Sequence, residues 1–358
     1  MKTMKKVFSL LLGLFIVGSL LSVTVLAQPQ TPKPTSPITF KVAHEFGPKN
    51  AIGIAGLHFK QAVDVKLAGR VKMEYFPAGQ LFDTKACHRE LKSGSIQCTV
   101  ASTSYMQSFD PLWGIAEYPF IFNNAEHFWA TLEQSEAGRQ LITRTIEGGT
   151  TFLGKALSTK HSMMKYIFSN KPIRGIRDFK GLKLRNPPGW MMAKIMDNLG
   201  ASNVTISIAE FTTALQQGMV DGTMTNAMGW IVWGGLLRDK SPNILNFPFG
   251  SAYSYSAVNT QWWNSLPYDI KKDLEPLIAE FGDEIGRLWW EQYLVMWKDI
   301  AELEKQGKFG VVVPSADFAK ALTDCQTPLY DEFINKIPSA KEVLDVAKKI
   351  APKYPVKE

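Results

Sequence analysis

From residue 38 onward the sequence alternates between strand-like and helix-like segments, and this alternation restricts the fold more than any other feature. The first strand-like stretch, ITFKVAHEF, leads into a helix-like stretch at 51–67. Further strand-like segments lie at 70–77 and 96–102, with a helix expected between them from Asp83 to Lys92. Strands that alternate with helices are typical of βαβ units and a mostly parallel sheet. The sequence therefore predicts an α/β fold.

The second half of the chain repeats this pattern. A strand is expected over 154–169, a short strand at 181–185, and helices at 188–200 and 208–218. The chain beyond residue 37 has about 320 residues, more than the ~250 to 300 at which a single core stops growing. We therefore expect two domains.

A long amphipathic helix is expected near the C-terminus. Apolar residues recur at steps of three and four between Leu266 and Lys305, which predicts one helix, or two helices broken near Pro276. Forty helical residues would span ~60 Å, enough to cross from one domain to another.

The N-terminus has the pattern of a secretory signal peptide. Three lysines precede the apolar run FSLLLGLFIVGSLLSVTVLA, which ends at Ala27. The alternative is a retained membrane anchor, since ~20 apolar residues can span a bilayer. Glycines and serines interrupt the run and no charged flank follows it, which favours cleavage after Ala27. The proline-rich segment 28–37 is typical of an extended linker, so we expect a periplasmic protein that folds from Ile38.

Charge and cysteine content exclude two classes of protein. The formal net charge of +7 falls to +4 without the three signal-peptide lysines, and no basic cluster is present. Nucleic acid is therefore not an expected partner, because such sites are clustered basic stripes. The three cysteines cannot form a fully paired framework. We expect three small buried thiols, with a disulfide between Cys87 and Cys98 as the alternative.

The common catalytic motifs are missing from the sequence. It contains no G-x-S-x-G, H-E-x-x-H, P-loop, G-x-G-x-x-G or C-x-x-C motif. Its five histidines do not fall at metal-ligand spacing, so neither a metal nor another cofactor is predicted. These gaps favour a binding protein over an enzyme.

Two polar residues lie at the carboxyl ends of expected strands, where ligands bind in open α/β sheets. His44 ends the first strand and Arg185 ends the strand at 181–185. A guanidinium matches a carboxylate with two parallel donors and keeps its charge. From the residues alone, Arg185 is either a ligand clamp or a surface salt-bridge partner.

Tryptophans near this segment allow two interpretations. Trp190 and Trp230 either pack against a flat or apolar ligand or belong to the core. The tryptophans of the C-terminal helices are expected in the core.

Several segments, in order, are similar to one known family. PIRGIRDFKGLKLRNP, LGAS and EFTTALQQGMVDG closely resemble segments of the extracytoplasmic solute-binding proteins of tripartite ATP-independent periplasmic (TRAP) transporters, DctP type. The earlier FPAGQL, LKSGSIQCTVAST and EYPFIFNNAEH, and the later NTQWWNSLPYDIKKDL, resemble the same family. The resemblance runs from Ile38 to about Ala340.

The resemblance implies roles for individual residues. In that family the arginine ending GLKLR forms a salt bridge with the substrate carboxylate, and here it is Arg185. Lys165 matches a second basic residue, although a lysine lacks the arginine fork. VDGTMTN replaces the usual VDGQEN, so Thr225 matches an asparagine that often touches ligand, and the resemblance leaves Asn226 as its substitute after a small shift. The other positions implied for the pocket are Gly189, Ile208, His44, Ser102 and Thr103, with Trp190 beside them.

The family fold implies two α/β domains that close on a ligand around a hinge and cleft, with the long C-terminal helix bridging them. We expect a signal peptide at 1–27, a linker at 28–37, a first domain at 38–162 plus about 251–290, and a second at 163–250 plus about 291–345.

The implied function is periplasmic capture of an organic acid and its delivery to the membrane subunits of a TRAP permease. The alternatives are a ligand sensor for a membrane signalling receptor and a secreted α/β enzyme acting on small acids. Lys165, Thr225 and the two tryptophans favour a less polar or aromatic acid over sialic acid or a C4-dicarboxylate.

Overall fold

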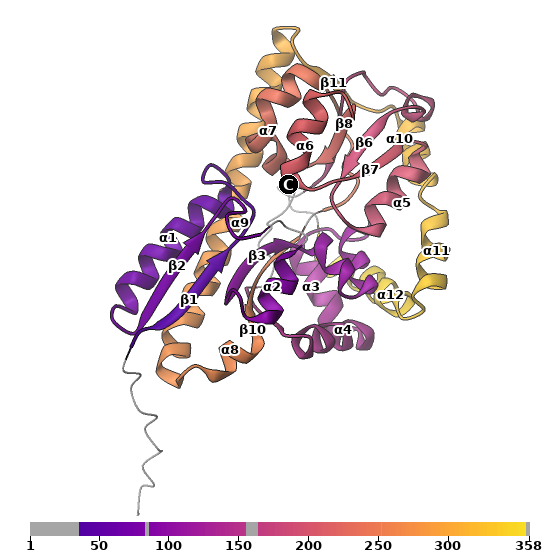
Figure 1. The fold of residues 1–358 in the computed structure, drawn as a ribbon. Coiled ribbons are helices and arrows are strands. Elements are labelled where there is room, and N and C mark those ends of the chain that lie inside the picture. The colour runs from indigo at the N-terminus through magenta and orange to yellow at the C-terminus, as the bar shows by residue number, and fades with distance from the viewer. Residues whose placement is uncertain (1–35, 83–85, 155–163, 252, 356–358) are drawn as a thin grey trace, which may run out of the picture. The chain divides into compact units, whose positions relative to one another are not determined.

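Two β-sheets organise the computed structural model, which describes residues 36–82, 86–154, 164–251 and 253–355 (Figure 1). The first sheet has the strand order β2-β1-β3-β10-β4. Its strands are β1 Ile38–Ala43, β2 Val71–Phe76, β3 Cys98–Ser102, β4 Thr150–Gly154 and β10 Ser254–Asn259. The second sheet has the order β11-β9-β5-β8-β6-β7. Its strands are β5 Tyr166–Ser169, β6 Lys183–Asn186, β7 Ser202–Thr205, β8 Gly222–Thr225, β9 Asn243–Leu245 and β11 Gly310–Val312.

Each sheet is mixed rather than fully parallel. β10 is antiparallel to both of its neighbours, β3 and β4, whereas β1 is parallel to β2 and β3. β5 is likewise antiparallel to β8 and β9, while β6 is parallel to β7 and β8. The reversed strands follow from the chain path, which passes from the first sheet to the second after β4 and returns to the first sheet at β10.

The helices connect the strands and pack beside them. Those of the first half are α1 Ala51–Lys66, α2 Cys87–Ser93, α3 Ala125–Gln134 and α4 Glu136–Glu147, with 3-10 helices η2 Thr103–Ser108 and η3 Pro111–Glu117. Those of the second half are α5 Trp190–Leu199, α6 Ile208–Gln216, α7 Ala227–Lys240, α8 Thr260–Ser265, α9 Tyr268–Lys305, α10 Ala316–Asp324, α11 Pro328–Lys336 and α12 Ala340–Ile350, with 3-10 helices η5 Ile176–Phe179 and η6 Ala351–Lys353.

The expected segments coincide with these elements, with three differences. α5 begins at Trp190 rather than at Pro188, with Gly189 as its N-cap. The strand expected over 154–169 corresponds to the end of β4 and to β5, and residues 155–163 lie outside the described residues. Asp83, the expected start of α2, also lies outside them.

α9 is one uninterrupted helix of 38 residues, although Pro276 lies inside it. Its first half packs on α1, where the rings of Phe281 and Phe59 stack with centroids 4.7 Å apart. Its second half buries Met296 and Ile300 in the cluster that holds Trp230. Ile270 and Leu274, which precede the proline, are buried in the same cluster as Phe281, which follows it. Packing on both sides of the proline offsets the hydrogen bond that a proline removes from a helix. The alternative of two helices was wrong.

A hydrophobic core runs between the two sheets. One cluster of buried residues includes Tyr255 of β10, Leu184 of β6, Met191 of α5 and Phe333 of α11. The described residues between 36 and 355 accordingly belong to one compact unit. The α/β class with a long helix contacting both parts is confirmed, and the domain boundaries given above stay a prediction.

The cysteines that the structure describes form no disulfide. Cys87 and Cys98 are buried and Cys325 is half-buried. Burial raises the pKa of Cys98 to about 12, so this thiol stays protonated and unreactive at neutral pH.

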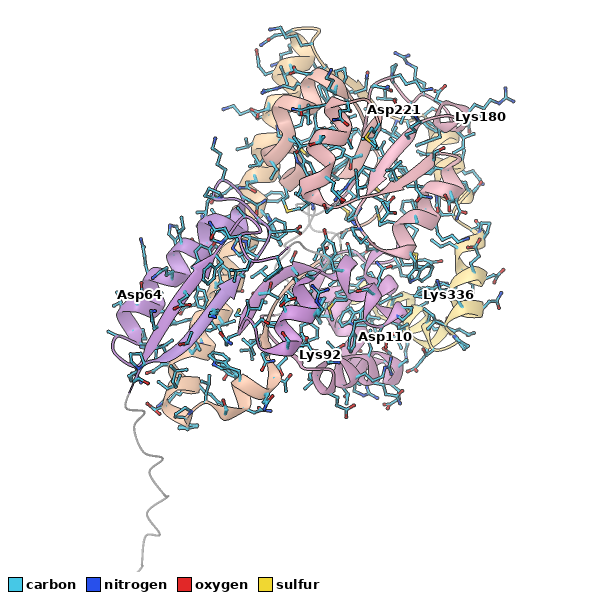
Figure 2. All side chains as sticks on the ribbon, viewed as in Figure 1. Asp64, Lys92, Asp110, Lys180, Asp221 and Lys336 are labelled. Carbon is cyan, nitrogen blue, oxygen red and sulfur yellow. The ribbon has the colours of Figure 1, made fainter. Side chains whose placement is uncertain are left out.

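Charged side chains project from the outer faces of the helices, as Asp64 on α1 illustrates (Figure 2). In the part of the chain that the structure describes, no helix is both long and apolar enough to cross a membrane.

Candidate ligand-binding site

A small cavity lies where strands of both sheets end. Ser102 is the last residue of β3 and Thr225 the last of β8, and both line it. Lys165 precedes β5, whose reversed direction brings its start to the same edge, since Tyr166 pairs with Thr225. Carboxyl ends of parallel strands are the usual ligand sites of α/β sheets. Because β5 is antiparallel to β8, Lys165 lies at this edge of the sheet. A parallel strand would place the residue before it at the opposite edge.

The cavity has a volume of about 50 Å³. Six of the predicted site residues line it, namely Ser102, Lys165, Arg185, Ile208, Thr225 and Asn226. The sequence prediction missed eight lining residues, which are Glu45, Phe46, Ser104, Tyr105, Pro187, Met224, Met228 and Trp233.

Arg185 is buried in the wall of this cavity. Only 3% of the residue is exposed, and its Nε donates to the carbonyl oxygen of Ile206 at 3.0 Å. Its Nη2 is buried and has no hydrogen-bond partner among the described residues. The guanidinium carbon lies 5.6 Å from the Phe211 ring centroid and 5.7 Å from that of Trp233.

The electrostatics of Arg185 follow from this burial. Burial lowers the pKa of the guanidinium, and nearby Tyr105 and Glu45 oppose the shift. The group keeps its charge because a guanidinium pKa starts above ~12. Cation–π contact of the kind seen here contributes ~0.5 to 2 kcal/mol, less than burying an ion costs. Arg185 is therefore a buried cation with a donor still to be satisfied.

Lys165 has a different environment. Its Nζ forms an ion pair with Oε1 of Glu117, and the Oγ of Ser104 donates to the same oxygen. Oε2 of Glu117 accepts from Nε2 of Gln107 at 2.9 Å. Both charged residues are buried. Lys165 thus lines the cavity with its charge already neutralised by the protein.

A second cavity, of about 410 Å³, shares Ser104 and Tyr105 with the first. Gly189 and Trp190 line it. A Cβ at Gly189 would lie 2.8 Å from Nε2 of Gln107, so a larger residue here would displace that side chain. The two predicted residues are thus beside the Arg185 cavity rather than in its wall.

Contacts with neighbouring elements fix the position of Trp190. Its Nε1 donates to the carbonyl oxygen of Pro111 at 3.1 Å. Nζ of Lys336, at the end of α11 (Figure 2), lies 4.3 Å from its ring centroid. Trp190 therefore joins α5 to η3 and α11 at the rim of the second cavity.

The structure places Trp230 outside both of these cavities. It is 3% exposed, packs on Phe168 and Phe309, and donates from Nε1 to Asp299 at 3.2 Å. Trp233, one helical turn later, lines the first cavity instead. Trp230 therefore lines neither cavity, because the helix turns this ring toward β5 and α9.

His44 and Thr103 also lie outside the walls of these two cavities. Nδ1 of His44 accepts the Phe46 amide at 3.2 Å, so Nε2 donates to the Tyr75 hydroxyl at 2.7 Å. Burial lowers the pKa of His44 to about 3. This neutral ring holds Phe46, which does line the cavity. Thr103 donates from Oγ1 to the carbonyl oxygen of Tyr253.

Two helices begin at the cavity wall. Ile208 is the first residue of α6, and Asn226 caps α7 by accepting the Met228 amide at 3.2 Å. The N-terminal ends of helices carry a partial positive charge that favours anions. Together with Arg185, they suit the cavity to a carboxylate.

Some of the missed residues had a signal in the sequence. Glu45 and Phe46 directly follow β1, so the strand-end rule applied to His44 extends to them. Trp233 follows Trp230 by one turn, and periodicity alone did not decide which ring faced a ligand. Glu117 had no such signal, because its partner Lys165 is 48 residues away in the chain.

Comparison with known proteins identifies the family. The model of the family described as "Bacterial extracellular solute-binding protein, family 7" (DctP) matches residues 42–336. The C4-dicarboxylate-binding periplasmic protein DctP of Rhodobacter capsulatus is 26% identical over 334 residues, covering 90% of this chain and 94% of that protein. The sialic acid-binding periplasmic protein SiaP of Vibrio cholerae is 30% identical over 276 residues, covering 75% and 80%.

A solved structure shares the fold. A TRAP periplasmic solute-binding protein from Shewanella oneidensis with bound succinate superposes with a TM-score of 0.78 at 22% identity, covering 88% of this chain and all of that one. DctP-type proteins are periplasmic receptors. The chain belongs to the family 7 bacterial extracellular solute-binding proteins, the DctP type of TRAP transporters.

Proposed function

We propose that this protein captures an organic acid anion through a salt bridge from Arg185 and delivers it to a TRAP-type membrane permease. Release then regenerates the empty receptor, and the acid is not chemically changed. The signal peptide is cleaved near Ala27, which places the receptor in the periplasm.

The buried Nη2 of Arg185, without a hydrogen-bond partner among the described residues, carries this proposal. An unsatisfied charged donor in the interior costs free energy in the absence of ligand. A carboxylate that accepts from this group removes that cost, and the low local dielectric strengthens the charge pair. Such a group is expected at a binding site rather than in a purely structural position.

The relatives support the same chemistry. The names and descriptions of the similar proteins give C4-dicarboxylate, sialic acid and succinate as their ligands. All of these ligands carry a carboxylate, which is the group that the Arg185 cavity suits.

Residues from both sheets complete the site. Ser102 comes from the first sheet, and Arg185 and Thr225 come from the second. If the predicted domains close on a ligand at this cavity, the closed shape is what a permease recognises. Ile208 and Asn226 supply the helix ends, and Trp190 and Gly189 border the neighbouring cavity.

Ligand titration of the purified mature protein tests the proposal. Mono- and dicarboxylates are screened by thermal shift, and the strongest hits are measured by calorimetry. Arg185→Met is expected to weaken binding at least thirtyfold, the lower end of what truncating one partner of a buried charge pair costs. Arg177→Met is the matched control, since Arg177 is exposed on η5.

The proposal fails if Arg185→Met binds the best acid as tightly as the Arg177→Met control does. Nuclear magnetic resonance of the acid after overnight incubation with the protein checks that the acid is not chemically changed. Recovery of the unchanged acid is expected, and a new product would indicate an enzyme instead.

A further inference from the structure

We propose that Glu117 makes this receptor selective for acids with a single carboxylate and an uncharged tail. This inference rests on the proposed capture of an acid by Arg185. It adds that Lys165, the second cation of the cavity, is not available to a ligand.

The geometry around Glu117 explains why. The carboxylate accepts from Lys165 and Ser104 at Oε1 and from Gln107 at Oε2. Only 2% of Glu117 and 5% of Lys165 are exposed. The Gln107 side chain is fixed in turn, because its Oε1 accepts the Met191 amide at 3.1 Å. The Glu117 carboxylate is thus held by two side chains of η2 and by Lys165, which directly precedes β5.

A second ligand carboxylate would compete with this internal one. To bind Lys165, the ligand carboxylate would have to displace the Glu117 carboxylate. Glu117 would then be buried without its cation. Removing one partner of a buried ion pair is far more costly than making a new contact with the other. Glu117 is therefore expected to remain paired with Lys165 when a ligand binds.

The balance of charges near the cavity also favours a ligand with a single carboxylate. Arg185 and Lys165 contribute two positive charges, and Glu45 and Glu117 contribute two negative charges. Glu45 lines the cavity itself and interacts with Arg185. One bound carboxylate adds one negative charge beside Arg185, whereas a dianion adds a second that meets carboxylates of the protein.

The remaining wall offers a tail mostly uncharged surface. Phe46, Ile208, Met224, Met228 and Trp233 contribute apolar atoms. The hydroxyls of Ser102 and Ser104 bond to each other at 3.0 Å. These groups suit alkyl or hydroxylated tails and do not neutralise an ionised one.

Matched acids test the selectivity. Wild-type protein is titrated by calorimetry with four pairs that differ by one terminal carboxylate: butyrate and succinate, 2-hydroxybutyrate and malate, pentanoate and glutarate, gluconate and glucarate. In the pair that binds most tightly, the monocarboxylate is expected to bind at least tenfold better. A tighter dicarboxylate that still depends on Arg185 overturns this inference and leaves the proposed function intact. If no pair binds in an Arg185-dependent way, the proposed function fails and this inference fails with it.

Two variants test the assigned cause. Glu117→Gln frees Lys165, and the ratio of dicarboxylate to monocarboxylate affinity is expected to rise at least tenfold. Lys165→Met combined with Glu117→Leu removes both charges and is expected to keep the wild-type preference. An unchanged ratio in Glu117→Gln, or a lost preference in the double variant, overturns the role of Glu117.

Discussion

Arg185 and Lys165 are buried cations in the wall of the same cavity, but they differ in how fully the protein satisfies their charge and their hydrogen-bond donors. Around Lys165, an acid, a hydroxyl and an amide complete a polar network. Around Arg185, two aromatic rings, the Ile206 carbonyl, the Tyr105 side chain and the charge of Glu45 still leave the Nη2 donor unsatisfied. We therefore expect the loss of Lys165 to affect mainly the stability of the fold, and the loss of Arg185 to affect mainly ligand binding.

The strongest test of this comparison is the stability of a Lys165 variant. Lys165→Met leaves Glu117 buried without its cation, so we expect the free energy of unfolding to fall by about 3 to 5 kcal/mol. Urea unfolding followed by circular dichroism at pH 7 measures the loss. Lys165→Met with Glu117→Leu is expected to regain most of it. A loss below about 1 kcal/mol in the single variant would show that the pair is not structural.

His44 is a third buried basic residue, and it differs from Arg185 and Lys165 because its side chain stays neutral. Its pKa is lowered to about 3, while the unfolded chain binds the proton near pH 6.5. Between these values the unfolded state holds more protons, so stability is complete above pH 6.5 and falls as the pH drops. At pH 5 this residue alone is expected to cost about 2 kcal/mol.

Urea unfolding at pH 7 and pH 5 checks the histidine prediction by comparing the wild type with His44→Gln. The wild type should lose about 2 kcal/mol more between the two pH values. His58→Gln serves as the control, because His58 is exposed on α1. Equal pH dependence in the wild type and His44→Gln would show that burial does not suppress protonation there.

The smallest expected change in stability belongs to Arg185. Arg185→Met removes a buried charge with an unsatisfied donor, and it also removes the hydrogen bonds to the Ile206 carbonyl and the Tyr105 side chain. These effects have opposite signs, so the free energy of unfolding should stay within about 1 kcal/mol of the wild type. Measurement beside Lys165→Met under the same conditions completes the comparison. If Arg185→Met lowers the free energy of unfolding as much as Lys165→Met does, the two cations contribute equally to stability and the comparison is wrong.

The sequence predicted the elements better than it predicted the site. Alternation and turn residues found α1, β1, β2 and the long C-terminal helix because these features depend on local periodicity. The reversal of β5 and β10 depends on long-range pairing, which periodicity does not encode.

Within the site, Arg185 was singled out by its strand end and a family resemblance, and Thr225 by the resemblance. Both line the cavity, and their contact with a ligand stays a prediction. The identity of the tryptophan at the wall depended on the rotation of α7, which placed Trp233 there. The partner of Lys165 depended on tertiary packing, and no local pattern marked Glu117.

The position of β10 between β3 and β4 has a consequence for the newly made chain. Strands β1 to β4 lie within the first 154 residues, but the strand that joins β3 to β4 ends at Asn259. Until that residue leaves the ribosome, both strands keep open edges, and the first sheet cannot be completed. We therefore expect the chain to remain incompletely folded through most of its synthesis, which suits the export that the predicted signal peptide implies.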